Sequence, residues 1–215
     1  MSEADTIAAA APVLRWCAPS RAEGGSPAAA TMQEETAEAR IDAAEQSPGD
    51  DLQAAVRGGR ERGLVMHKLF EEVLTGETRD ASADLQARAA GLIAQLCGPS
   101  NPCALSADDI AGCVGRTMRL PEIARLRPGL EPEYNVYGAL VAGNEEVVTT
   151  GIADAISFSS DGRPEVVIDW KSDVAPTEAT LLHYRAQVGN YLAMTGAKRG
   201  LIVLATSGKV IAVSA

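Results

Sequence analysis

The sequence is poor in aromatic residues and lacks the long apolar runs and leader patterns of membrane and secreted proteins. Aromatic residues make up 4% of its 215 residues, so a core must be built mainly from alanine, leucine, valine and isoleucine. No run reaches the roughly 18 apolar residues that a membrane-spanning helix needs. The chain does not start with basic residues followed by an apolar stretch, so we expect no secretory signal and no membrane contact.

The cysteines also lack a recognisable pattern. The four of them, Cys17, Cys97, Cys103 and Cys113, are scattered and show no metal-ligand spacing such as C-x-x-C. Reduced thiols in a cytoplasmic protein are the simplest interpretation. We therefore expect a cytoplasmic location.

The charge is strongly acidic but unevenly distributed. The formal net charge is −10, and residues 1–56 carry ten acidic and three basic residues. The other 159 residues carry 19 acidic and 16 basic residues, which is close to balance. Composition thus gives no positive support for nucleic-acid binding. A bound divalent cation would neutralise some of the remaining acids.

The chain divides into two parts by composition. Residues 1–56 are rich in alanine, glutamate, serine, proline and glycine, and bury too little apolar surface to offset the entropy of ordering. We predict an acidic, low-complexity and largely flexible segment, in which the apolar patch from Val13 to Trp16 could dock on another surface. Residues 57–215 are predicted to fold, with a helical part at 60–127 and a sheet-bearing core at 131–215.

Apolar periodicity changes between these two halves of the folded part. Four helices are predicted in the first, beginning near Arg60, Ser82, Ser106 and Pro121. A period of two then predicts three strands at 133–140, 147–158 and 165–171, arranged as an antiparallel meander. A helix at 178–195, stopped by Gly196, and two strands at 200–205 and 210–213 follow. The expected fold class is α/β, with a mixed central sheet flanked by helices and preceded by extra helices.

Chemistry is concentrated where two of these strands end. Alternation along a strand puts Asp169 and Lys171 on the same face. A hairpin that turns at Asp161-Gly162 pairs position n with roughly position 323 − n, so Asp154 lies opposite Asp169. Neighbouring carboxylates repel each other unless a cation lies between them. Mg²⁺ or Mn²⁺ would fill that role, since both prefer carboxylate oxygens.

Lys171 would then orient an attacking water or offset charge in the transition state. A bare D-x-K pattern is, however, more often an ordinary ion pair on an exposed strand. Two further features favour the metal site. His67 lies in the apolar stripe of the first helix, where it is either a core residue or a neutral imidazole ligand, and Glu71 shares its face. Gln187 and Tyr191 share a stripe with Tyr184 on the last helix, either packing on the sheet or contacting substrate.

Taken in order, these residues resemble a known family. The succession Gly63-x-x-x-His67, Glu133, Gly151-x-x-Asp154, Asp169-Trp170-Lys171 and Gln187-x-x-x-Tyr191 is similar to the nuclease domain of RecB and AddA-type helicase-nucleases, in the PD-(D/E)XK nuclease superfamily. The resemblance covers residues 60–213. It implies a restriction-endonuclease-like core with the order αβββαβ.

The resemblance also implies roles for the residues. His67, Asp154 and Asp169 would ligate the metal together with the main chain of Trp170. Lys171 would be the catalytic lysine, and Gln187, Tyr191 and Glu133 would be auxiliary residues that position substrate. Two matches are less secure, because Glu131 competes with Glu133 and because Asp173 only extends the face of Asp169.

The chain departs from this family in two respects. Some relatives hold an iron–sulfur cluster with three cysteines after the last helix, but no cysteine here follows Cys113, so we expect no such cluster. A G-x-x-x-x-G-K-[ST] phosphate loop is absent, so the chain is expected to have no ATPase of its own. The implied partners are DNA, single- or double-stranded, and as a candidate a superfamily 1 helicase subunit.

The sequence therefore predicts a Mg²⁺- or Mn²⁺-dependent deoxyribonuclease in DNA repair or recombination, with exonuclease activity favoured. A non-catalytic DNA- or helicase-interaction module that retains the nuclease fold is the main alternative. An unrelated α/β domain in which the motifs occur by chance is the third.

Overall fold

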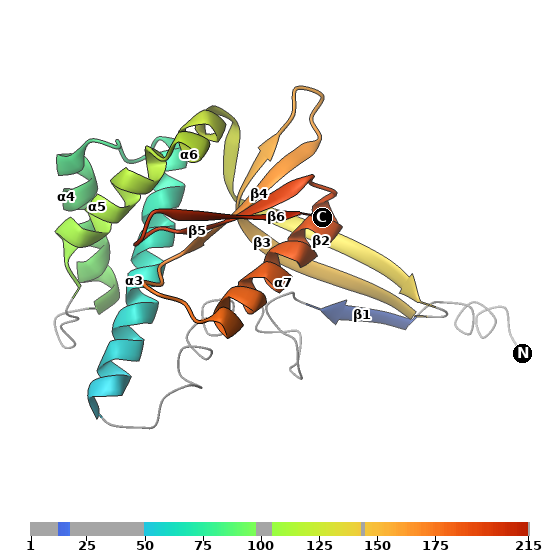
Figure 1. The fold of residues 1–215 in the computed structure, drawn as a ribbon, viewed down its shortest axis with the longest axis horizontal. Helices are drawn as coiled ribbons and strands as arrows, with labels where there is room; N and C mark the ends of the chain where they lie inside the picture. The colour runs from blue at the N-terminus through green and yellow to red at the C-terminus, as the bar shows by residue number, and fades with distance from the viewer. Residues whose placement is uncertain (1–12, 18–49, 98–104, 143–144, 215) are drawn as a thin grey trace, which may run out of the picture.

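A computed structural model describes residues 13–17, 50–97, 105–142 and 145–214, and every structural statement below refers to these residues (Figure 1). Within them, a mixed sheet is flanked by helices. The strands are β1 (Val13–Cys17), β2 (Leu130–Ala142), β3 (Glu145–Phe158), β4 (Pro164–Lys171), β5 (Arg199–Leu204) and β6 (Lys209–Ser214). The helices are α3 (Asp50–Thr75), α4 (Ser82–Cys97), α5 (Ala107–Met118), α6 (Pro121–Leu126), the short 3-10 helix η2 (Arg127–Gly129) and α7 (Glu178–Thr195).

Local signals account for the ends of several helices. The Ser106 side chain accepts a hydrogen bond from the Asp109 main-chain N–H at the start of α5. Gly76 and Gly196 adopt positive φ angles directly after α3 and α7, which ends both helices as expected. The predicted ranges of α5 and α7 are thus confirmed.

The start of α3 differs from its prediction near Arg60. The helix begins ten residues earlier, at Asp50. Residues 53–56 are glutamine, alanine and valine, none of which breaks a helix. The prediction followed the apolar stripe, which begins later in the sequence, and so missed this extension. Of residues 1–56, which were predicted to be flexible, only β1 and residues 50–56 of α3 are among the described residues.

The sheet has the predicted meander at its centre. In chain order β2, β3 and β4 are antiparallel neighbours, and β4 continues to β5 in parallel and β6 in antiparallel orientation. Ala155 pairs with Ile168 and Ile156 with Val167, which is the predicted hairpin register. The apolar patch at 13–16 docks within the chain, because β1 pairs in parallel with residues 145–149 of β3.

Two apolar cores lie on opposite faces of the sheet. Helices α3 to α6 cover one face, and α7 covers the other (Figure 1). Phe70 of α3 stacks on Trp170 of β4 with ring centroids 4.7 Å apart, which joins α3 to the strand that carries the motif. Val188 and Leu192 of α7 pack against Val167 and Ile202 on the second face. None of the helices described is long and apolar enough to cross a membrane.

A buried ion pair joins α3 to α4. Glu72 is 2% exposed, and its carboxylate accepts hydrogen bonds from Arg88 at 2.7 and 2.6 Å and from the Thr78 hydroxyl at 2.8 Å. The Arg88 hydrogen bonds lower the pKa of Glu72, burial opposes them, and Thr78 lowers it further. The ionised form is therefore favoured in the folded state.

We expect Glu72→Gln to lower the free energy of unfolding by about 1–3 kcal/mol at pH 7, because it removes charge-assisted hydrogen bonds at a buried position. The folded-state pKa of Glu72 lies below its unfolded value of about 4.3, so its contribution is complete above that pH and is lost as the pH falls through the folded-state pKa. The difference between variant and parent in urea unfolding should therefore shrink under acidic conditions.

Glu71→Gln is the matched control for this experiment. The neighbouring Glu71 carboxylate is more exposed and pairs with Lys68 at 2.9 Å. Its replacement should change the unfolding free energy by less than about 1 kcal/mol. Equal effects of the two substitutions at pH 7 would contradict the assignment of a stabilising role to the Glu72 pair.

Candidate metal centre

The site begins where β3 and β4 separate. Ala155 and Ile168 form the last pair of their ladder, and the same register continued by one step sets Asp154 opposite Asp169. Here a side chain of β3 binds the main chain of β4: Asp154 Oδ2 accepts a hydrogen bond of 2.6 Å from the Trp170 N–H. The Asp154 carboxylate is thus held at the end of β4.

Helix α3 contributes an imidazole to the same point. His67 Nδ1 lies 3.4 Å from Asp154 Oδ1, and both side chains are half-buried. Burial raises the pKa of Asp154, but the positive charges of His67 and Lys171 and the hydrogen bonds from His67 and Trp170 outweigh it, so the pKa is lowered overall. The ionised form of this carboxylate is therefore favoured.

Glu133 of β2 completes a possible ligand set. His67, Glu133 and Asp154 each offer one ligand atom, and these atoms lie within 4.8 Å of one another. One imidazole and two carboxylates are donors that suit Mn²⁺, and the carboxylates suit Mg²⁺. The chemistry of this donor set fits the divalent ion that the sequence predicted, although Glu133 was expected only as an auxiliary residue.

The backbone at Glu133 explains how β2 reaches this site. Glu133 has a φ of 49°, and it is the one non-glycine residue with positive φ among those described. On one side of it Leu130 packs in the core under α3 to α6, and on the other Val136 packs in the core under α7. An even spacing would normally keep both on one face. The left-handed residue lies at the place where β2 passes from one core to the other, and such conformations concentrate at functional positions.

The Asp169 and Lys171 side chains form a second polar group beside this set. Lys171 Nζ lies 3.2 Å from Asp169 Oδ1 and donates a 3.1 Å hydrogen bond to Gln187 Oε1 of α7. The two charged side chains are 3% and 2% exposed, respectively. Asp169 is not among the three residues whose ligand atoms converge within 4.8 Å. The structure thus joins Asp169 to the lysine, and joins Asp154 to the imidazole, with the Trp170 main chain between them.

Tyr184 is a site residue that sequence reasoning left out. The ammonium group of Lys171 lies 4.5 Å from the centre of its ring, a cation–π arrangement. Its hydroxyl donates a 2.7 Å hydrogen bond to Asp173 Oδ2, just beyond the end of β4. The signal was present, because Tyr184 precedes Gln187 by three residues on the same stripe of α7.

The other predicted residues lie around these groups. Tyr191 is buried in the core under α7. Glu131 is exposed and pairs with Ile156, away from the three converging ligand atoms. Glu71 is engaged by Lys68 and is not part of that set either. Of the two competing glutamates on β2, the structure therefore brings Glu133 to the site.

Comparison with known proteins relates the chain to one described family. A family model described as the PD-(D/E)XK nuclease superfamily matches residues 36–210. No curated protein matches the chain. The crystal structure of a protein named SSO0001 is similar to 70% of this chain and 74% of that one, with 21% sequence identity and a TM-score of 0.34.

Proposed function

The chain belongs to the PD-(D/E)XK nuclease superfamily, and from this premise we propose that it is a Mg²⁺- or Mn²⁺-dependent deoxyribonuclease of the RecB and AddA type. The family is one of metal-dependent nucleases with a restriction-endonuclease-like α/β fold. One observation carries the proposal: His67, Glu133 and Asp154, from three elements far apart in sequence, present ligand atoms within 4.8 Å of one another beside a buried lysine.

In this proposal His67, Asp154 and Glu133 hold the ion, with Asp169 and the Trp170 main chain next to them. The bound ion would lower the pKa of a water molecule and stabilise the charge that develops on the phosphate. Asp154 also fixes the end of β4 through its hydrogen bond with the Trp170 N–H. The residues on the two strands therefore keep their mutual positions before substrate binds.

Lys171 would supply positive charge to the phosphate in the transition state or orient the attacking water. Asp169, Gln187 and the Tyr184 ring surround its ammonium group and limit its rotamers. Gln187 and Tyr191 would act as auxiliary residues, the first through Lys171 and the second by fixing α7 on the sheet. A lysine held in this way needs little reorganisation during the reaction.

The biological setting proposed for this activity is DNA repair or recombination. We favour an exonuclease that acts with a superfamily 1 helicase subunit, on single- or double-stranded DNA, because the motif order is similar to that of helicase-nucleases. The scattered cysteines support a cytoplasmic location.

Cleavage assays with the full chain test the activity. End-labelled single-stranded and duplex DNA should be degraded with Mn²⁺ or Mg²⁺ and should remain intact with a chelator. Covalently closed circular DNA should resist cleavage if the activity is exonucleolytic. Calorimetric titration should detect Mn²⁺ binding to the same preparation.

The opposite outcome would favour a different class of function. Failure to bind Mn²⁺, together with intact DNA under every condition, would contradict the nuclease proposal. It would favour the interaction module, in which the fold holds DNA or a helicase without cutting. The distinction is needed because a fold alone does not determine function.

A further inference from the structure

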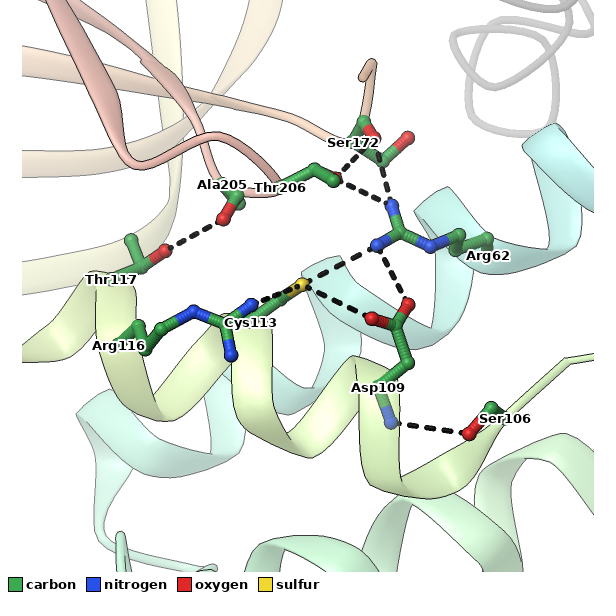
Figure 2. Close-up of polar contacts among 9 residues, drawn as sticks. All are labelled: Arg62, Ser106, Asp109, Cys113, Arg116, Thr117, Ser172, Ala205 and Thr206. Carbon is green, nitrogen blue, oxygen red and sulfur yellow. Dashed lines mark hydrogen bonds and ion pairs between the residues drawn. The ribbon is translucent and has the colours of Figure 1, made fainter.

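A half-buried arginine on α3, Arg62, reaches the end of β4, the strand that carries the motif. The Arg62 guanidinium donates hydrogen bonds of 2.8 Å to the Ser172 carbonyl and 2.8 Å to the Thr206 hydroxyl (Figure 2). Its other terminal nitrogen contacts Asp109 Oδ2 at 3.1 Å and Cys113 Sγ at 3.4 Å. One side chain thereby connects α3, α5, the end of β4 and the turn after β5.

The Ser172 carbonyl is the centre of these contacts. It accepts from Arg62 and also, at 2.7 Å, from the Thr206 hydroxyl (Figure 2). Directly before it, the Lys171 carbonyl accepts a hydrogen bond of 2.9 Å from the Ala205 N–H. The main chain that leaves β4 is therefore held from both the sheet and the helix.

Helix α3 also comes very close to this main chain. A β-carbon added at Gly63 would lie 3.4 Å from Ser172 Oγ, so the space between the helix and the strand end there is little more than one β-carbon wide. His67 lies little more than one turn further along the same helix. The helix thus contacts the strand end at Arg62 and β3 at His67, and approaches the strand end closely at Gly63.

We propose that Arg62 is a positioning residue of the nuclease site. By holding the Ser172 carbonyl against α3, it fixes Asp169 and Lys171 on β4 relative to His67 on α3. The inference rests on the proposed function, because the distance it sets is that between the metal-binding imidazole and the catalytic lysine. The guanidinium suits this task, since its planar donors reach two acceptors at once.

Three variants of the full chain test this role. Arg62→Met keeps the apolar stem and removes the hydrogen bonds, and Arg62→Lys restores one cationic donor. Arg60→Met is the matched control, because Arg60 is exposed on the same helix two residues earlier. The measurements are amide hydrogen exchange at residues 170–174, Mn²⁺ affinity by calorimetry, and kcat and KM for DNA cleavage.

In Arg62→Met we expect faster exchange at 170–174 and a roughly tenfold loss in both Mn²⁺ affinity and kcat, as is typical when groups that orient ligands are removed. KM for DNA should stay within about a factor of two, because the arginine does not touch substrate. Arg62→Lys should lie between Arg62→Met and the parent, and Arg60→Met should match the parent in exchange and Mn²⁺ affinity.

A further variant, at Thr206, covers the case in which Arg62→Met does not fold. Thr206→Val removes the other donor to the Ser172 carbonyl at nearly constant volume, and should shift exchange, Mn²⁺ affinity and kcat in the same direction by a smaller factor. Folded variants whose exchange, or whose Mn²⁺ affinity and kcat, equal those of the parent would overturn the inference. A parent that neither binds Mn²⁺ nor cuts DNA would instead overturn the proposed function, and this inference with it.

Discussion

Asp154→Asn should abolish DNA cleavage while leaving the fold intact. The amide oxygen can still accept the hydrogen bond from the Trp170 N–H, so the end of β4 keeps its place. The charge that faces His67 and would hold the ion is lost. Because metal stabilisation of a transition state is worth several kcal/mol, we expect kcat/KM to fall by about a thousandfold or more. Single-turnover cleavage with Mn²⁺, calorimetric Mn²⁺ titration and a thermal melt measure the three consequences.

Asp161→Asn is the control for this substitution. Asp161 lies exposed at the turn between β3 and β4, at the far end of the hairpin from Asp154. Its replacement makes the same chemical change and should leave Mn²⁺ affinity and cleavage unaltered. If the Asp154 variant bound Mn²⁺ and cleaved DNA like the parent, the metal centre would have to lie elsewhere.

Lys171→Met should also abolish cleavage, but with Mn²⁺ binding retained. The ammonium group contacts Asp169, Gln187 and the Tyr184 ring. Lys171 is not one of the three residues that offer converging ligand atoms. Its removal takes away positive charge next to the phosphate without removing a ligand. We expect kcat to fall by about a hundredfold to a thousandfold, the range found when one preorganised donor is removed.

Stability has to be measured in the same variant. Lys171 and Asp169 are buried together, and breaking a buried pair by removing one partner costs about 3–5 kcal/mol. Activity should therefore be compared at a temperature where thermal melts show the variant fully folded. The double variant Asp169→Asn/Lys171→Met removes both charges and should recover part of the lost stability without recovering cleavage.

Lys198→Met serves as the control, because Lys198 is an exposed lysine that lies between α7 and β5. Its kcat should equal that of the parent. Cleavage retained by a folded Lys171→Met variant would contradict the proposed role. Loss of Mn²⁺ binding in that variant would show that the lysine organises the ligands instead.

Local sequence signals predicted the parts of the fold that local physics decides. A serine cap and a glycine stop marked α5 and α7, and a two-residue turn signal was enough to give the register of β3 and β4. That register brought Asp154 next to the end of β4, which is the centre of the site. The order of motifs predicted the superfamily, which the family model confirms.

Other features depend on contacts between distant segments and could not be read locally. Positive φ angles are usually signalled by glycine or asparagine, and Glu133 is neither, so its left-handed conformation was not predicted. It is Glu133, and not Asp169, that belongs to the converging set with His67 and Asp154. The Arg62 contacts join residues that are 110 positions apart in the sequence for Ser172 and 144 for Thr206. The periodicity of a helix or a strand cannot predict contacts at such separations.

The parallel pairing of β1 with β3 has a consequence for how the molecule is made. Val13 leaves the ribosome long before its partner, Glu145, because the helices α3 to α6 lie between them in the sequence. Closing so large a loop is entropically slow, so this pairing belongs to the last steps of folding. The helices can gather around Phe70 while the chain is still growing, but this side of the sheet must wait until translation is well advanced.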